Sequence, residues 1–305
     1  MNILITGSAG FIGKGLICCL SKHHKVVEVV RKIESPESKV NKIFQVDIKG
    51  GTDWSELLPD TDAIIHLAAV AHNKSNDLSY IDSVNVKGTV NLAVQAVNSG
   101  VKRFIFISSI GVLGNKTKNG LLLNELSQIT AKSEYTKSKA KAEVELLKIA
   151  KEIKLEVVII RPVLVYGPNA PIGNFGKLVD LVKKIPALPF GVCKNKRSFL
   201  SIDNLADFIS VCIAHPKAKN EIFCISDGVD VSIKEFTNAI AKGLGKRLLQ
   251  LPVPNFAFNL LGKITGKADQ IEQLTGDLQV DSSKARELLG WHPPFTMEDT
   301  FKKLK

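Results

Sequence analysis

The stretch that decides the fold of this chain is Ile3-Leu4-Ile5-Thr6-Gly7-Ser8-Ala9-Gly10-Phe11-Ile12-Gly13. Its apolar start predicts a buried strand, and its three glycines predict a tight turn leading into a helix over 14–20. Glycine lets a phosphate approach the backbone amides, and a helix N-terminus favours negative charge. A glycine triplet alone is weak, but its place between a strand and a helix favours a nucleotide-binding turn over an ordinary glycine-rich loop.

Beyond this turn, short apolar runs alternate with longer amphipathic runs. The pattern predicts strands over 25–30, 42–46, 62–67, 102–108 and 156–161, and amphipathic helices over 80–98 and 133–154. Apolar strands separated by helices indicate a parallel sheet with both faces covered. We therefore expect an α/β fold, a doubly wound parallel sheet (Rossmann), whose ligand crevice lies at the C-terminal ends of the strands.

The second half of the chain has a different composition, richer in proline and glycine from Val163 onward. We expect a dinucleotide-binding domain over 1–165 and a smaller, mainly substrate-binding α/β region over 166–305. A segment near 200–226 is expected to pack back on the first domain. Further elements are predicted over 175–184 (helix), 221–226 (strand) and 232–244 (helix).

Composition excludes several classes of protein. Of the 305 residues 45% are hydrophobic, yet no run reaches the roughly 18 apolar residues of a membrane span. The start lacks the basic region of a signal peptide, so a cytoplasmic protein is expected. The net charge of +11 comes from scattered lysines without interleaved aromatics, which argues against nucleic acid. The five cysteines form no C-x-x-C pair, and no metal site is expected.

The residues after the second strand bear on the choice of dinucleotide. An NAD enzyme usually carries an acidic residue there, but this chain has Arg31-Lys32. Because a guanidinium can pair with a 2′-phosphate, Arg31 favours NADP(H), with NAD(H) possible. The alternative is a solvated basic turn, with Glu28 or Glu34 accepting from the ribose.

Two later strand ends carry further cofactor candidates. Asp47, followed by Ile48, either accepts from the adenine amino group or is an ordinary turn aspartate. The small residues in Leu67-Ala68-Ala69 either let a cofactor lie against the backbone or permit close helix packing.

The fifth strand ends in Ser108-Ser109, and a helix that begins near residue 133 carries Tyr135 and Lys139. Residues four apart share one helix face. A phenol titrates near 10, so acid–base work near neutrality needs a stabilised phenolate. A neighbouring lysine and a cationic nicotinamide act in that direction. The glycine turn, strand-end serine and Tyr-x-x-x-Lys helix seldom occur together by chance, and they predict an enzyme.

Several motifs together resemble the extended short-chain dehydrogenase/reductases, and within them the nucleotide-sugar epimerase/dehydratase/reductase branch. The motifs are Thr6-Gly7-x-x-Gly10-Phe11-x-Gly13, His66-Leu67-Ala68-Ala69, Asn85-Val86-x-Gly88-Thr89, Ser108-Ser109, Tyr135-x-x-x-Lys139, Arg161-Pro162-x-x-Val165-Tyr166-Gly167-Pro168, Asp281-Ser282-Ser283-Lys284 and Leu288-Leu289-Gly290-Trp291. The likeness covers the whole chain and extends to bacterial UDP-sugar 4-epimerases and to 4-keto-sugar reductases of polysaccharide clusters. It is specific for the family and much less so for the substrate.

The resemblance implies roles for single residues. Tyr135 would exchange a proton with the sugar oxygen, Lys139 would hold the nicotinamide ribose, and Ser109 would hydrogen-bond the reacting oxygen. Cofactor contacts are implied at Gly7, Gly10, Phe11, Ile12, Gly13, Arg31, Asp47, Ile48, Leu67, Ala68, Ala69, Asn85, Tyr135, Lys139 and Pro162.

Substrate contacts are implied at Ser109, Asn174 and Arg197. Arg197 would hold the substrate diphosphate, although the residues alone favour a solvated basic loop there. One departure from the family is Leu113, which stands where many relatives carry tyrosine, so the pocket wall is expected to differ.

Three functions are compatible with these motifs. The favoured one is a 4-keto reductase that consumes NADPH and makes a UDP-N-acetylquinovosamine-type product for surface polysaccharide. The alternative is a UDP-sugar 4-epimerase with retained NAD, and the third is a non-catalytic NADP-binding regulator. Arg31 favours the reductase. The amphipathic helices over 80–98 and 133–154 resemble those that pair in family dimers, so a homodimer is expected.

Overall fold

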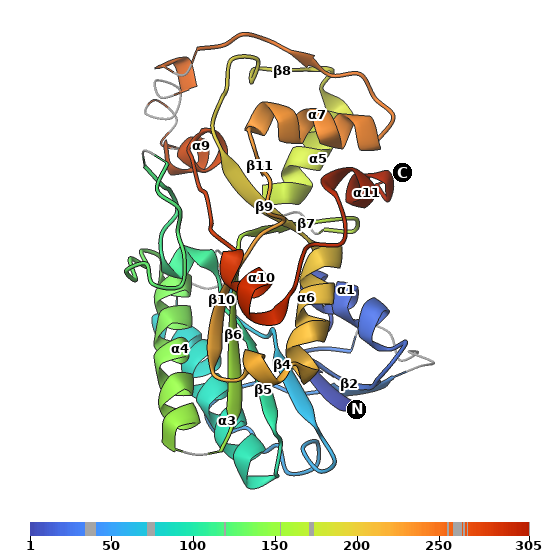
Figure 1. Cartoon of the computed structure of the whole chain (residues 1–305), viewed down its shortest axis with the longest axis vertical. Coiled ribbons are helices and arrows are strands. Elements are labelled where there is room, and N and C mark those ends of the chain that lie inside the picture. Colours follow the sequence, from blue (N-terminus) through green and yellow to red (C-terminus); the bar gives the residue numbers. More distant parts are fainter. Residues whose placement is uncertain are drawn as a thin grey trace.

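The computed structural model describes residues 1–33, 41–71, 77–118, 120–152, 154–170, 174–254, 256–258, 264, 266 and 268–304, with only the backbone of 174 and 269. Within this part of the chain, seven strands form one sheet in the order β10-β6-β5-β4-β1-β2-β3, and every neighbouring pair is parallel (Figure 1). The strands are β1 (Asn2–Thr6), β2 (Lys25–Val30), β3 (Lys42–Gln45), β4 (Ala63–His66), β5 (Arg103–Ile107), β6 (Glu156–Pro162) and β10 (Glu221–Ile225). The doubly wound parallel sheet is confirmed.

Helices cover both faces of this sheet (Figure 1). One face carries α1 (Phe11–Leu20) and α6 (Ile202–Ala214), and the other carries α3 (Thr89–Asn98) and α4 (Glu134–Glu152). The helix expected over 80–98 is built from α2 (Leu78–Asp82), a π-helical turn η1 (Ser83–Gly88) and α3. Such turns insert a residue into a helix and often mark functional positions.

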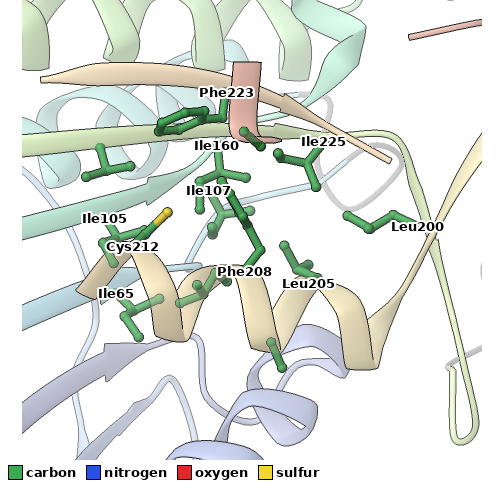
Figure 2. Packing of buried hydrophobic residues seen from close by; sticks show 14 of the residues in the cluster. Ile65, Ile105, Ile107, Ile160, Leu200, Leu205, Phe208, Cys212, Phe223 and Ile225 are labelled. Atoms are coloured by element: carbon green, nitrogen blue, oxygen red, sulfur yellow. The ribbon is translucent and has the colours of Figure 1, made fainter. Parts of the chain in front are cut away.

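The core on the α6 face joins segments that lie far apart in sequence (Figure 2). Leu205, Phe208 and Cys212 of α6 pack against the strand residues Ile105 and Ile160. The C-terminal segment returns to the same face through α10 (Ser283–Leu289), and the indole of Trp291 donates to Asp207 at 2.7 Å.

The smaller region lies beyond the C-terminal ends of the strands (Figure 1). It contains β7 (Leu164–Tyr166), β8 (Ala187–Leu188), β9 (Arg197–Ser201), β11 (Asp230–Val231), β12 (Leu249–Gln250), α5 (Asn174–Lys184), α7 (Ile233–Gly243), α9 (Ala268–Thr275) and α11 (Met297–Lys302). Its core is an aromatic cluster around Tyr166, whose ring centroid lies 5.0–6.5 Å from those of Phe175, Phe199, Phe236 and Phe301. The division of the chain at 165/166 stays a prediction.

Two short 3₁₀ turns complete the described elements, η2 (Ile110–Val112) and η3 (Pro216–Ala218). Among the described residues, no helix combines the length and the apolar character needed to cross a bilayer.

A buried ion pair fixes α4 to the sheet. The guanidinium of Arg161 in β6 donates from Nε and Nη2 to the two carboxylate oxygens of Glu143 in α4, at 3.0 and 2.7 Å. The side chains are only 4% and 2% exposed, so neither charge has water to replace its partner. Losing one partner therefore leaves the other charge buried and alone.

Replacing Arg161 by methionine should lower the free energy of unfolding by about 3–5 kcal/mol, because the Glu143 carboxylate stays buried without its partner. The control is Lys148→Met, which breaks the exposed Lys148–Glu145 pair on the same helix and should cost less than about 1 kcal/mol. Denaturant-induced unfolding, followed by circular dichroism, measures both. Equal losses in the two variants would contradict the structural role of the buried pair.

Candidate active site

The turn after β1 is closed so tightly that two of its positions require glycine. Gly7 has φ of +73°, and a Cβ there would lie 2.8 Å from the backbone nitrogen of Ala68. A Cβ on Gly13 would lie 2.4 Å from the carbonyl oxygen of Ser8. The backbone of Gly7 also donates to the Val29 carbonyl of β2 at 2.9 Å. The turn is therefore wedged between β2 and the segment after β4.

The N-terminus of α1 fits a phosphate group. The helix begins after Gly10, which supplies no side-chain cap, and its first turn contains no acidic residue. Most helices satisfy their first amides with a capping side chain. Here the amides and the positive end of the helix dipole are left for an anion, which is how a dinucleotide pyrophosphate is held.

The predicted catalytic residues come together where β5 ends and α4 begins. Lys139 is only 1% exposed, and its Nζ donates to the carbonyl oxygen of Ile107 at 2.8 Å. The same Nζ lies 6.0 Å from the ring centroid of Tyr135 and 4.3 Å from that of Phe106. Ser109 is the second residue after β5, and its Oγ accepts from the Gly111 amide at 3.1 Å.

Burial shifts both titrating groups away from their charged forms. It raises the pKa of Tyr135 to about 12 and lowers the pKa of Lys139 to about 7, with the nearby Glu143 carboxylate opposing the second shift. The phenol is therefore protonated at neutral pH in the protein alone. Its use as a base depends on positive charge brought close to it.

Asn85 braces the site from the π-helical turn. Its Oδ1 accepts from the Val70 amide at 2.7 Å, and its Nδ2 donates to the Val70 carbonyl and to the Ser138 hydroxyl at 3.1 and 2.9 Å. The Ser138 hydroxyl in turn donates to the carbonyl of Tyr135. Asn85 thus joins the loop after β4 to the helix that carries Tyr135.

A second buried network runs through His66, at the end of β4. Its Nδ1 lies 2.7 Å from Thr6 Oγ1 and its Nε2 lies 2.9 Å from Thr89 Oγ1. Because the Thr89 hydroxyl donates to the Asn85 carbonyl, it accepts from His66, which places the proton on Nε2. Burial, assisted by the charge of Lys139, lowers the pKa of His66 to about 3 and keeps the ring neutral.

A cavity of about 1070 Å³ connects these parts with the smaller region. Eleven of the predicted site residues line it: Gly7, Gly10, Phe11, Ile12, Gly13, Leu67, Ser109, Tyr135, Lys139, Pro162 and Arg197. None of the described lining residues is aspartate or glutamate. A cavity with lysine and arginine but without carboxylate suits an anionic ligand.

Arg197 is the buried cation on the far side of this cavity. It is 9% exposed, and its Nη1 donates to the Gly276 carbonyl at 3.0 Å. The ion pairs of the described residues do not include it. Burial lowers its pKa to about 10, so it is still charged at neutral pH. The charge of Asp277 acts on Arg197 without forming an ion pair with it, so the guanidinium can still hold a phosphate.

Six of the predicted cofactor residues do not line the cavity: Arg31, Asp47, Ile48, Ala68, Ala69 and Asn85. Arg31 is exposed just after β2, and Ala68 and Ala69 are half-buried beside the glycine turn. Asp47 is exposed and forms an ion pair with Lys49 at 2.6 Å.

Two further positions that the sequence analysis singled out have side chains that pack in the core. The side chain of Ile48 packs in the core on the α3 face, so only its backbone could reach a ligand. Leu113 packs in the core on the α6 face and does not line the cavity, and the expected difference in the pocket wall stays a prediction.

The sequence offered Glu28 or Glu34 as the acidic residue that accepts from the cofactor ribose. The carboxylate of Glu28, in β2, is buried and accepts a hydrogen bond from the Asn41 side chain at 2.9 Å. Glu34 lies outside the described residues. The predicted substrate residue Asn174 begins α5 as expected, but its side chain is also outside the described part.

The sequence analysis gave no role to seven polar residues of the cavity wall: Ser108, Asn115, Ser133, Thr136, Lys177, Gln270 and Gln273. The two glutamines are three apart on α9 and share a face, but nothing local shows where that face points. Lys177 could have been noticed in the sequence, because a lysine near the start of a helix is unfavourable with the helix dipole and suggests another role.

The shifted pKa of Lys139 makes stability depend on pH. An unfolded lysine keeps its proton to about pH 10.4, whereas folded Lys139 releases it near pH 7. Between these values the unfolded state binds more protons, so this lysine makes the protein more stable as pH rises. The difference in melting temperature between nucleotide-free wild type and Lys139→Met should shift in favour of the wild type from pH 7 to pH 9.5. Parallel curves of melting temperature against pH for the two proteins would refute the lowered pKa of Lys139.

Comparison with known proteins agrees with this geometry. The sequence profile described as "NAD dependent epimerase/dehydratase family" matches residues 3–226. A UDP-glucose 4-epimerase of Vibrio cholerae is 45% identical over 309 residues, which cover 99% of this chain and 93% of that protein. The solved UDP-glucuronic acid 4-epimerase of Bacillus cereus in complex with NAD has a TM-score of 0.79 and 25% identity, over 99% of this chain and 94% of that one. The solved UDP-N-acetylglucosamine 4-epimerase of the same species has a TM-score of 0.81 and 20% identity, over 100% and 98%.

The family model covers most of the chain, and the V. cholerae relative matches it almost from end to end. The resemblance to the extended short-chain dehydrogenase/reductases is thereby confirmed, and the chain belongs to the NAD dependent epimerase/dehydratase family.

Proposed function

We propose that this protein is a UDP-sugar 4-epimerase that keeps its NAD bound through the reaction. The observation that carries the proposal is the 45% identity, along nearly all of both chains, to a UDP-glucose 4-epimerase. The reductase favoured by the sequence motifs would use the same Ser109, Tyr135 and Lys139. The relative supports the epimerase alternative better than the reductase.

The chain supplies the proton chemistry of such a reaction. NAD, when bound, would accept a hydride from C4 of the sugar and later return it. The Tyr135 oxygen takes the proton from the 4-hydroxyl as the 4-keto sugar forms and gives it back on reduction. Ser109 hydrogen-bonds the same oxygen. Lys139 brings the positive charge that lowers the phenol's pKa from its raised value, and it holds the nicotinamide ribose.

The substrate side of the proposal rests on charge. A UDP-sugar carries a diphosphate, and the cavity offers the buried Arg197 together with Lys177 at its wall. No described lining residue is acidic, so nothing there repels the phosphates. The proposed ligand is therefore a nucleoside diphosphate sugar whose C4 reaches Tyr135.

A second candidate remains the NADPH-consuming 4-keto reductase, and one observation favours it. Arg31 is exposed at the end of β2, where a 2′-phosphate could pair with it. The buried Glu28 already accepts from Asn41, which makes it a poorer acidic partner for a ribose than a free carboxylate. The identity of the retained nucleotide separates the two candidates.

The test of the function combines the released nucleotide with turnover. Denatured wild-type protein should release NAD, as shown by mass spectrometry, and native protein should interconvert UDP-glucose and UDP-galactose without added cofactor. Tyr135→Phe should lower kcat by at least about a hundredfold, because it loses the acid–base oxygen but keeps the ring, and it should still release NAD. Purified protein that releases no nucleotide, binds NADPH better than NADH and reduces a 4-keto sugar would establish the reductase instead.

The homodimer is proposed through α3 and α4, by likeness to the family. Val94 on α3 and Val144 on α4 are 37% and 44% exposed, and pairing with a second copy would cover them. Val144→Glu should shift sedimentation from dimer to monomer, whereas Val229→Glu, at another exposed valine, should not. A wild type that sediments as a monomer at micromolar concentration would contradict the dimer.

A further inference from the structure

Ser108 carries a polar group that the described protein does not satisfy. Its side chain is 3% exposed, and its Oγ has no hydrogen-bond partner. Most buried hydroxyls are hydrogen-bonded, because leaving one unpaired is costly. Ser108 lines the cavity that also contains Ser109, Tyr135 and Lys139. A ligand in that cavity is therefore the natural partner for this hydroxyl.

The carbonyl oxygen of Ser108 is free of the sheet for a separate reason. Ile107 pairs with Ile160, and the Ser108 amide donates to the Ile160 carbonyl at 2.8 Å. The next bond of a parallel ladder would run from the amide of residue 162 to the Ser108 carbonyl. Residue 162 is proline, which has no N–H. Ser108 thus provides a hydroxyl donor and a carbonyl acceptor released from the ladder, next to Pro162 at the cavity wall.

The position of this pair indicates which part of a ligand meets it. Lys139 donates to the carbonyl of Ile107, one peptide before Ser108. Under the proposed function Lys139 holds the nicotinamide ribose, and the glycine turn holds the pyrophosphate. The polar group that remains on the nicotinamide half is the ring carboxamide, which has one acceptor oxygen and an amino group. A hydroxyl beside a free carbonyl is complementary to that group.

We propose that Ser108 binds the nicotinamide carboxamide, with its hydroxyl donating to the carboxamide oxygen and its own carbonyl accepting from the amino group. This contact restrains the ring in the cavity, so Ser108 acts as a positioning residue beside the acid–base residue Tyr135. The inference rests on the nicotinamide dinucleotide of the proposed function, but not on which sugar is converted.

The test compares two nucleotides on Ser108→Ala protein freed of bound nucleotide. Calorimetric titration should show affinity for NAD reduced roughly tenfold, the usual effect of one lost hydrogen bond to a buried group. Affinity for ADP-ribose, which lacks the nicotinamide ring, should equal that of the wild type. The matched control is Ser109→Ala at the neighbouring hydroxyl, which should lose turnover and keep its affinity for NAD.

Melting temperatures distinguish a lost contact with NAD from a general loss of stability in the variant. Without nucleotide, Ser108→Ala should melt at or above the wild-type temperature, because it removes an unpaired buried hydroxyl. With saturating NAD its gain in melting temperature should be smaller than that of the wild type.

Two results would overturn the proposal. One is an equal loss of affinity for NAD and ADP-ribose, and the other is an unchanged affinity for NAD with a raised KM for the UDP-sugar, which would assign the hydroxyl to the substrate. A wild type that binds NAD but epimerises no sugar would refute the proposed function only, since the titration of Ser108→Ala does not depend on turnover.

Discussion

The hydrogen bond from Lys139 Nζ to the Ile107 carbonyl is the contact on which the rest of the site depends. It joins the second turn of α4 to the end of β5. Tyr135 lies one turn before it and Glu143 one turn after it, where the carboxylate is fixed to Arg161. With two buried anchors on the same face, the helix can neither slide nor rotate against the sheet. The position of the phenol is therefore set by the sheet and not by the loop that precedes it.

The fold and the centre of the site could be predicted because their signals are local. Strands such as 25–30 and 156–161 are continuous apolar runs, and burial on both faces of a parallel sheet needs nothing more. Tyr135 and Lys139 are four residues apart, so helix geometry alone places them together. Gly7 is required locally by its φ of +73°, and Gly13 is required by its contacts with the backbone of Gly7 and Ser8 in the same turn.

The remaining features depend on contacts between distant segments and leave no local pattern. Arg197 is held by the carbonyl of Gly276, and the C-terminal part of the chain is joined to α6 by the hydrogen bond from Trp291 to Asp207. The sequence left Asp47 either as an acceptor from adenine or as a turn aspartate. The structure shows it in an ion pair with Lys49, which no motif indicated. The importance of Ser108 is visible only when the register of β5 and β6 places a proline opposite it.

The neutral state of His66 has a consequence for the interpretation of kinetic data. Histidine is ordinarily the first residue suspected when an enzyme responds to pH near neutrality. This imidazole is held between two threonine hydroxyls and gains a proton only near pH 3, so it is silent across the whole working range. A transition in turnover observed near pH 7 would therefore come from Tyr135 or Lys139, the two titrating groups of the site, and not from this histidine.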